Sequence, residues 1–265
     1  MAVEHTSMTT PRPLSIRFTR KGALIPETYA AARSWNPQLG VDANLVRIRQ
    51  ENLIGAKSSA WLKDVVVTLA ARFRQGGGLL PLVTLAQGGY PIERWRDGLL
   101  WHLGAQGALW YAFLTEWLFP AYTDGVIQMR ANDVVPFVLA QTKGLAADGQ
   151  GLTTYGQTRT ARDLLLMADA FGLLQGRVVK AFAGYQLDDA GFLYVLHALA
   201  EREAHPQRII EAPEWRMYLM RPADVEHVLL RLHQFQRVEY QAAGSIIHLR
   251  LPYRSLLAYA ESLVS

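Results

Sequence analysis

Residues 57–74 read KSSAWLKDVVVTLAARFR and contain the strongest local pattern in the chain. Large apolar residues recur at every fourth position, namely Trp61, Val65, Leu69 and Phe73. This period predicts a helix with one apolar face. Ser58 comes just before the helix, where its hydroxyl can accept a hydrogen bond from a backbone N–H of the first turn. Three glycines at 76–78 mark the end of the predicted helix.

Two shorter helices are predicted ahead of this one. Pro26 suits the first turn of a helix that ends near Ser34, because its missing N–H costs nothing there. A second helix is expected from about Asp42, as its N-cap, to Asn52, with Gly55 in the break that follows. Two helices, a tight break and a third helix are the plan of a helix-turn-helix. Any three-helix bundle with solvated basic faces shows the same pattern, so both interpretations remain open.

The net charge of +4 is unevenly distributed along the chain. Between Arg12 and Arg74 there are 11 basic and 4 acidic residues, whereas residues 75–265 contain 16 basic and 18 acidic residues. A basic N-terminal third on a near-neutral body favours a polyanionic partner. Arginine outnumbers lysine by 22 to 5, and its planar guanidinium suits phosphates and guanine edges. A GC-rich genome would also raise the arginine content, but it does not explain the asymmetry.

The predicted helix-turn-helix supplies candidate contacts to DNA. Hydroxyls and backbone N–H groups at the start of the third helix can bind a phosphate. Basic side chains on the second and third helices can bind further phosphates. The candidate DNA-binding residues of this region are Arg47, Arg49, Lys57, Ser58, Ser59, Lys63, Arg72 and Arg74.

A second pattern, TRTAR at 158–162, leads into an apolar helix that ends near Phe171. Thr158 is the expected cap of this helix, and Arg159 and Arg162 share one face because they are three residues apart. A short strand is predicted at 178–182. A helix followed by a short β-hairpin is typical of winged-helix domains. Arg159 and Arg162 are therefore candidate DNA-binding residues as well.

Residues 237–251 predict a hairpin near the C-terminus, with Gly244 in its turn. The charged residues Arg237, His248 and Arg250 alternate with apolar ones along it. This alternation fits a second DNA-binding wing. It fits equally well an edge hairpin whose charges prevent pairing with other strands.

The stretch 98–119 is apolar and about long enough to span a membrane. However, His102, Gln106 and Glu116 interrupt it, and polar groups are costly in lipid. Its leucines and tryptophans recur at a spacing close to four, which fits a buried helix of a soluble bundle. The sequence therefore predicts no membrane-spanning helix.

The overall pattern predicts a mainly α protein in three parts. Residues 1–13 are expected to be a disordered tail that lacks the features of a secretory signal. Residues 14–150 are expected to form a helical domain with the helix-turn-helix, and residues 151–265 a winged-helix-like domain with a short β-hairpin. The absence of cysteine excludes disulfides and thiolate metal sites and fits a reducing, cytoplasmic compartment.

Motifs for catalysis are not found in the sequence. The seven histidines show neither an HExxH motif nor a paired metal spacing, and the glycines at 76–78 lack the lysine of a phosphate loop. No serine lies in a nucleophile elbow. His197 and Glu201 are four residues apart on one predicted helix, which ordinary helix geometry also explains. The sequence predicts a non-enzymatic protein without a cofactor or metal.

Several short stretches are spread along the chain between residues 18 and 219. They are Phe18–Thr28, Asn52–Leu53 with Lys57–Ser59 and Arg72–Arg74, Thr160–Arg162, Phe192–Tyr194 and Trp215–Leu219. In this order they resemble the BrxA family, small accessory proteins of bacterial BREX phage-defence systems. The resemblance implies a mostly helical fold with helix-turn-helix and winged-helix-like parts, and it implies binding to duplex DNA. The chain departs from the family pattern in its longer apolar middle region and its low lysine content.

The resulting expectation is a duplex-DNA-binding accessory protein of a BREX system, with other BREX proteins as further partners. The alternative is a structural adaptor that docks onto other defence proteins through its apolar, tryptophan-rich middle and its C-terminal domain. Salt-sensitive binding to duplex DNA distinguishes the two, because contacts with phosphates weaken steeply as salt rises.

Overall fold

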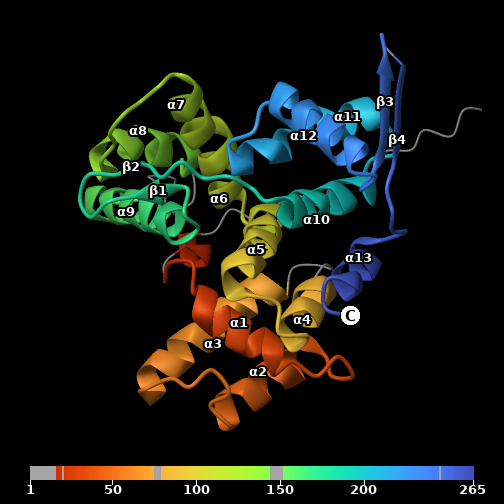
Figure 1. The fold of residues 1–265 in the computed structure, drawn as a ribbon. Helices are drawn as coiled ribbons and strands as arrows, with labels where there is room; N and C mark the ends of the chain where they lie inside the picture. Colours follow the sequence, from red (N-terminus) through yellow and green to blue (C-terminus); the bar gives the residue numbers. More distant parts are fainter. Residues whose placement is uncertain (1–15, 20, 75–78, 144–151, 245) are drawn as a thin grey trace, which may run out of the picture.

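The computed structural model describes residues 16–19, 21–74, 79–143, 152–244 and 246–265. The described chain is mainly helical with two short antiparallel hairpins, which confirms the predicted mainly α fold with a short β-hairpin near the C-terminus (Figure 1). The expected tail at 1–13, the glycines at 76–78 and the expected domain boundary at 150–151 lie outside the described residues.

The N-terminal third forms the base of the molecule in Figure 1. Its elements are η1 (Ile16–Phe18), α1 (Ile25–Arg33), α2 (Val41–Gln50), α3 (Ser59–Phe73) and α4 (Leu79–Gln87). The three predicted helices are present close to their predicted bounds, and the Ser58 hydroxyl caps α3 by accepting a hydrogen bond from the Trp61 N–H at 3.2 Å. The prediction that Asp42 caps α2 is wrong, because Gly40 is the N-cap and Asp42 lies in the first turn.

The connection between α2 and α3 spans residues 51–58. Asn52 and Gly55 adopt left-handed conformations in it, with φ of +48° and +64°. The Asn52 side chain closes the loop, since its amide donates to the Ala56 carbonyl at 3.0 Å and its oxygen accepts from the Ala56 N–H at 2.8 Å. This loop is longer than the turn of about 3–4 residues in a helix-turn-helix. The two helices therefore keep the predicted order but are joined differently.

Helix α5 (Ile92–Gln106) runs through the centre of the molecule (Figure 1). Most of its residues are buried, and hydrogen bonds join it to both halves of the chain. The Trp95 indole donates to the Leu82 carbonyl at 2.9 Å, and the Tyr218 hydroxyl donates to the Asp97 carbonyl at 2.9 Å. The predicted buried helix is thus confirmed for this part of the apolar stretch.

The apolar stretch 98–119 is not one continuous helix. After Gly107 the chain continues as α6 (Ala108–Ala112), the π-helical turn η2 (Phe113–Leu118) and α7 (Phe119–Thr123). Gly107 lies against Phe18, and a Cβ atom there would be 2.7 Å from Cε1 of the ring. No helix in the described part of the chain is long and apolar enough to cross a membrane.

The next segment contains α8 (Ala131–Gln141), α9 (Thr154–Ala170), β1 (Leu174–Gln175) and β2 (Ala181–Phe182). β1 and β2 pair antiparallel, with Leu174 opposite Phe182. Met129, which precedes α8, forms an antiparallel bridge with Lys180 through two backbone hydrogen bonds of 2.8 Å. Along the chain, the helical segment from α6 to α7 is therefore followed by the bridge residue Met129, then by helices α8 and α9, and then by the β1–β2 hairpin.

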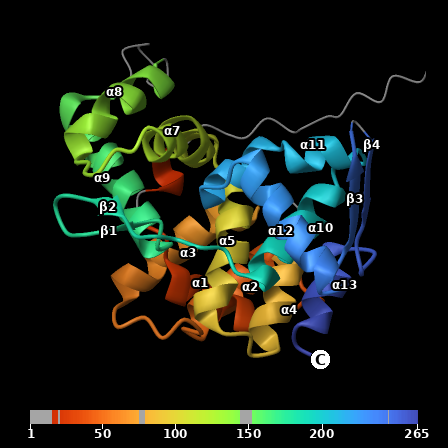
Figure 2. The same ribbon diagram turned by 45° about the horizontal axis from the view of Figure 1, so that its top comes forward.

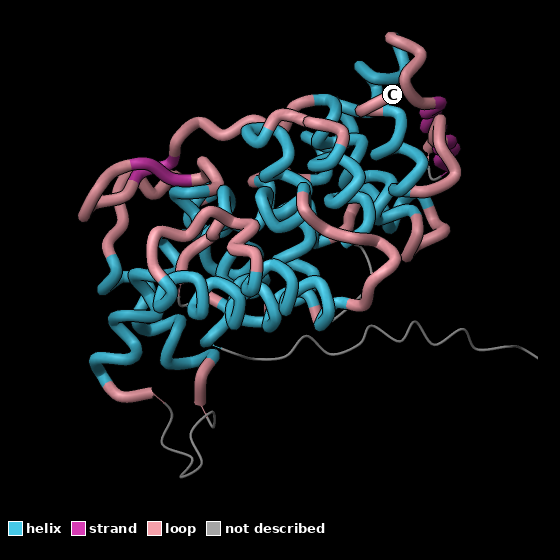
Figure 3. Tube along the Cα trace, turned by 90° about the horizontal axis from the view of Figure 1, so that it is seen from below, coloured by secondary structure: helices cyan, strands magenta, loops and turns pink. Residues whose placement is uncertain are grey.

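The C-terminal segment contains α10 (Asp189–Ala200), α11 (Pro206–Ile210), η3 (Pro213–Tyr218), α12 (Pro222–Gln234), β3 (Glu239–Ala243), β4 (Ile246–Arg250) and α13 (Leu256–Ser262). The predicted hairpin is confirmed, with Tyr240 of β3 opposite Leu249 of β4. Helix α13 returns to pack on α4 of the N-terminal third (Figure 2). The two hairpins lie at opposite ends of the molecule, with the helices between them (Figure 3).

Buried residues from both predicted domains belong to one hydrophobic core. Its largest fully buried side chains include Trp95, Trp110 and Trp215. The Trp215 ring stacks on Phe192 with ring centroids 4.7 Å apart, and its indole donates to the Ile209 carbonyl at 2.7 Å. This shared core holds the surface helices α3, α9 and α12 in fixed positions.

Candidate nucleic-acid interface

The start of α3 is a basic, hydroxyl-rich surface. Lys57, Ser58, Ser59 and Lys63 are all exposed, and the first turn of the helix contains no acidic residue. Within the described chain neither Lys57 nor Lys63 forms an ion pair. A helix start with N–H groups lacking intrahelical partners and nearby cations suits a phosphate. These four predicted residues are therefore placed together and reach solvent.

The two arginines of α2 differ in their surroundings. Arg49 is exposed, whereas Arg47 is half-buried. The Arg47 guanidinium donates a hydrogen bond to the Ser34 carbonyl at the end of α1. Arg47 thus ties α2 to α1, and Arg49 is the better placed of the two for a solvent-side partner.

The prediction of Arg72 as a DNA contact is wrong. Arg72 is fully buried, and its guanidinium donates hydrogen bonds to the carbonyls of Ala23 at 2.7 Å, Phe18 at 3.0 Å and Gly22 at 2.5 Å. Burial lowers the pKa of Arg72 to about 9. Arg72 joins the N-terminal segment to α3 and cannot reach a ligand in solvent.

Arg74, at the end of α3, is exposed but already paired. Its guanidinium lies 2.7 Å from a carboxylate oxygen of Asp42 on α2. Exposed ion pairs of this kind contribute little to stability. The pair does reduce the positive charge that Arg74 presents to a polyanion.

Helix α9 begins after a threonine cap and buries one of its faces in the core. Its N-cap is Thr153, whose hydroxyl accepts from the Gly156 N–H at 3.2 Å. The prediction of Thr158 as the cap is wrong, because Thr158 lies one turn inside the helix and its hydroxyl donates to the Thr154 carbonyl. The opposite face, which includes Leu164 and Leu165, is buried as predicted.

Four residues form the exposed stripe of α9, which we call the α9 stripe. They are Tyr155, Arg159, Arg162 and Leu166. Their positions, i, i+4, i+7 and i+11, place them on one face. Tyr155 is 75% exposed, and no ion pair joins either arginine to another described residue. The stripe includes two predicted residues and two others, Tyr155 and Leu166, that the same helical spacing would have identified.

The β1–β2 hairpin follows α9 and projects at the edge of the molecule (Figure 2). Its loop exposes Arg177 and Val178, and Val178 is 80% exposed. Gly176 has a φ of +111°, and an added Cβ would clash with the Val179 carbonyl oxygen, so glycine is required there. The buried Lys180 holds the loop by donating to the Gly176 carbonyl and pairing with Asp169 of α9. This loop is fixed to the helix that carries the α9 stripe.

Two charged residues of the C-terminal hairpin are paired across its strands. Both Arg250 and His248 lie near Glu239 on the paired strand, at 3.4 Å and 3.9 Å. These pairs fit the interpretation of an edge hairpin that blunts its strands with charge. Arg237, at the root of the hairpin, is exposed and faces a separate cavity described below.

The tryptophans of the apolar middle are largely inside the molecule. Trp95, Trp101 and Trp110 are buried, and Trp117 is partly buried. They therefore stabilise the core and are not displayed for a partner. An adaptor that docks through these rings would have to expose them first.

The described residues show no group of three histidine, aspartate or glutamate side chains that could hold a metal ion. The predicted neighbours His197 and Glu201 have other partners. The Nδ1 atom of His197 lies 2.7 Å from the Leu193 carbonyl, and Glu201 accepts a hydrogen bond from the Leu256 N–H at 2.8 Å. The pair thus has a structural role in fixing α10 and α13.

Two titratable groups of α5 are buried and have opposite pKa shifts. Burial raises the pKa of Asp97 to about 6, although the Tyr185 hydroxyl, which donates to its carboxylate at 2.8 Å, opposes this shift. Burial lowers the pKa of His102 to about 4. Between about pH 4 and 6 the folded chain therefore holds a proton on Asp97 that the unfolded chain releases. In the same range the unfolded chain holds a proton on His102 that the folded chain lacks.

These shifts predict that Asp97 and His102 change the stability in opposite directions with pH. Asp97 makes the free energy of unfolding fall as pH rises from about 4 to 6, and His102 makes it rise, each by up to roughly 3 kcal/mol. Asp97→Asn should therefore lose stability more steeply on acidification than the parent. His102→Gln should lose it less steeply. Urea unfolding at several pH values checks this, and parallel pH curves for all three proteins would contradict it.

No family model, curated protein or solved structure matches the chain. The residues and their geometry are therefore the basis for assigning a function. Two exposed basic surfaces are candidates for a nucleic-acid interface, namely the start of α3 and the α9 stripe with the β1–β2 loop. Both are exposed, and both are held by elements anchored in the core.

Proposed function

We propose that the chain is a non-enzymatic, cytoplasmic protein that binds duplex DNA through α9 and the β1–β2 hairpin. The observation that carries this proposal is the α9 stripe on a helix to which the loop of Arg177 is fixed through the ion pair of Lys180 with Asp169. An exposed helix face with two arginines and a tyrosine suits a groove and its flanking phosphates. In this proposal α9 is the recognition helix and the β1–β2 loop is the wing.

The order of elements from α6 to β2 supports a winged-helix unit that begins and ends earlier in the chain than the predicted one at 151–265. A helical segment, the bridge residue Met129, two helices and a hairpin follow one another. Lys180 joins the bridge to the hairpin, so the wing is tied both to the segment before α8 and to α9. A wing fixed in this way can contact a phosphate next to the groove that the helix enters.

The start of α3 is proposed as a second phosphate-binding surface. Lys57, Ser58, Ser59 and Lys63 lie together there, and Arg49 of α2 is also exposed. These contacts position a duplex without reading its sequence. This surface gathers exposed basic residues that have no ion pair with another described residue, whereas Lys21 is paired with Asp64 and Arg74 with Asp42.

The resemblance to the BrxA family gives the proposal its biological setting. We propose an accessory role in a BREX phage-defence system, with other BREX proteins as further partners. Exposed apolar residues of the C-terminal segment, Phe235 and Ile246, are the surface that a protein partner would use in the adaptor alternative. The adaptor alternative predicts no salt-sensitive binding to DNA.

We expect Arg159→Ala/Arg162→Ala/Arg177→Ala to weaken duplex binding by about tenfold or more, because charge-assisted hydrogen bonds to phosphates or bases are lost. The salt dependence should also become shallower, by about 0.9 for each phosphate contact removed. Mobility shifts on a random duplex and on a single strand at two salt concentrations measure both quantities. The parent should prefer the duplex.

The matched control is Arg208→Ala/Arg254→Ala, which removes exposed arginines from α11 and from the loop before α13. It should bind DNA as the parent does. Lys57→Ala/Lys63→Ala tests the second surface separately. If that variant loses all binding while the α9 triple variant binds normally, α3 is the recognition helix and our assignment is wrong. If the parent binds no duplex at low salt, the DNA-binding proposal fails.

A further inference from the structure

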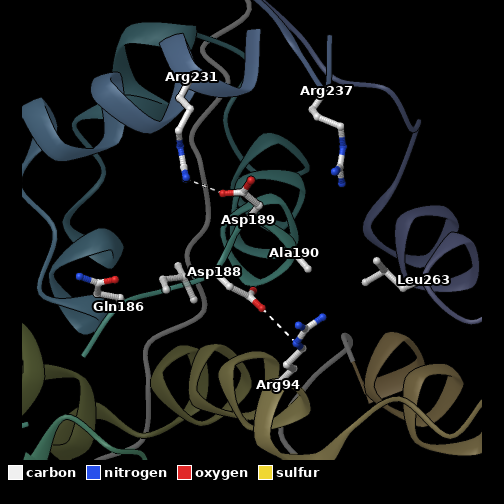
Figure 4. Close-up of a pocket in the computed structure, with 9 residues that line it drawn as sticks. Arg94, Gln186, Asp188, Asp189, Ala190, Arg231, Arg237 and Leu263 are labelled. Carbon is white, nitrogen blue, oxygen red and sulfur yellow. Dashed lines mark hydrogen bonds and ion pairs between the residues drawn. The ribbon is translucent and has the colours of Figure 1, made fainter. Parts of the chain in front are cut away.

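A cleft opens where the first turn of α10 meets α5, α12 and α13 (Figure 4). Helices α10, α12 and α13 lie away from the β1–β2 hairpin in Figure 1. Its volume is about 650 Å³. Ligand sites for small molecules commonly measure about 300–1,000 Å³. The cleft therefore has room for a small organic ligand, and the proposed DNA interface uses none of its residues.

Three arginines from different elements line this cleft. They are Arg94 of α5, Arg231 of α12 and Arg237 from the loop before β3. Arg94 lies 3.3 Å from Asp188, and Arg231 lies 2.5 Å from Asp189, so both guanidinium groups are held in place (Figure 4).

Arg237 differs from the other two arginines. Its side chain is exposed and is directed into the space above Ala190 and Leu263 (Figure 4). Among the described residues it has neither an ion pair nor a side-chain hydrogen bond. Three arginines against two aspartates leave the lining with net positive charge, and the unpaired guanidinium is the group that an incoming anion would meet.

The other lining groups limit the kind of anion. Asp188 and Asp189 provide acceptor oxygens, and Gln186 provides both a donor and an acceptor. Leu263 and Ala190 add an apolar wall. A ligand that fits this lining carries one anionic group for Arg237, hydroxyl groups for the aspartates and a flat or apolar body. A bare inorganic anion would bind Arg237 but would leave the aspartates and the apolar wall without a partner.

We propose that this cleft binds a small phosphorylated, hydroxyl-bearing molecule of the size of a nucleoside monophosphate. The phosphate lies against Arg237, whose planar fork matches its oxygens. The sugar hydroxyls donate to Asp188 and Asp189, which keep Arg94 and Arg231 in position. The proposal is independent of DNA binding, because no residue of the cleft belongs to the α9 stripe or to the start of α3.

Isothermal titration of the full chain with AMP, GMP, CMP and UMP tests the proposal, with inorganic phosphate and adenosine as partial probes. We expect saturable binding of at least one monophosphate, weaker binding of phosphate and none of adenosine. Arg237→Ala should lower the affinity for the monophosphate by about tenfold, because one charge-assisted hydrogen bond is lost. Arg254→Ala, an exposed arginine outside the cleft, should not change the affinity.

Thermal unfolding with and without the monophosphate provides a second readout, because a ligand that binds only the folded state raises the midpoint, and the rise grows with the logarithm of the ligand concentration divided by Kd. At the same ligand concentration that rise should be clearly smaller in Arg237→Ala, while the midpoint without ligand stays that of the parent. The proposal is overturned if no monophosphate binds, or if Arg237→Ala binds it normally. It is also overturned if Arg237→Ala weakens only duplex binding, which would assign this arginine to a DNA phosphate.

Discussion

Replacing Arg72 with methionine should lower the free energy of unfolding by about 3–5 kcal/mol, as expected when one partner of a buried polar network is removed. The guanidinium is fully buried and donates to the carbonyls of Phe18, Gly22 and Ala23. Methionine preserves most of the volume, so the loss measures the hydrogen bonds more than a cavity. Each carbonyl left without its donor costs about 1–3 kcal/mol. Urea unfolding followed by circular dichroism gives the value.

Arg74→Met is the matched control, because this arginine lies two residues away and is exposed. It should change stability by less than about 0.5 kcal/mol. Arg72→Lys should fall between the two, since an ammonium cannot serve three separate carbonyls with the geometry of a planar guanidinium. If Arg72→Met unfolds at the same urea concentration as Arg74→Met, the network does not stabilise the fold. A set of alanine variants for DNA binding should therefore leave Arg72 unchanged.

Arg72 also shows where prediction from the sequence fails. The period of four through Val65, Leu69 and Phe73 identifies the buried face of α3 correctly. Arg72 is adjacent to Phe73 and lies close to that face, but the positions of Arg72 and Arg74 in the sequence do not show which guanidinium is buried. The hydrogen-bond acceptors of Arg72 are backbone carbonyls far earlier in the chain, namely those of Ala23, 49 residues before it, and Phe18, 54 residues before it. Local spacing contains no information about such distant partners.

The α9 region was predicted more successfully because its signals are local. Spacing along one helix is sufficient to place Arg159 and Arg162 together, and Gly172 and Gly176 mark the turns that lead into the hairpin. The bridge between Met129 and Lys180 was not predicted, since it pairs residues on either side of two helices. The cleft around Arg237 was missed for the same reason. Its lining comes from four helices and the loop before β3, which only the packed core brings together.

Replacing Trp215 with alanine should lower the free energy of unfolding by about 3–5 kcal/mol, the usual cost of removing a large buried aromatic ring. The ring is 1% exposed, stacks on Phe192 and donates to the Ile209 carbonyl. Trp215→Phe is the control, because it retains a ring against Phe192 and loses mainly the indole hydrogen bond. It should cost about 1–2 kcal/mol.

The same variant tests whether residues 14–150 and 151–265 unfold separately. Core residues of both parts are in contact, the Tyr218 hydroxyl bonds to the Asp97 carbonyl across them, and α13 packs on α4. We therefore expect one cooperative unit, so Trp215→Ala should reduce the protection of amides in α1 and α3 against hydrogen exchange. Arg72→Met should do the same to α10 and α12. If each variant instead exposes only its own half, the chain consists of two independent domains. The central helix α5 would then stabilise only the half to which it belongs.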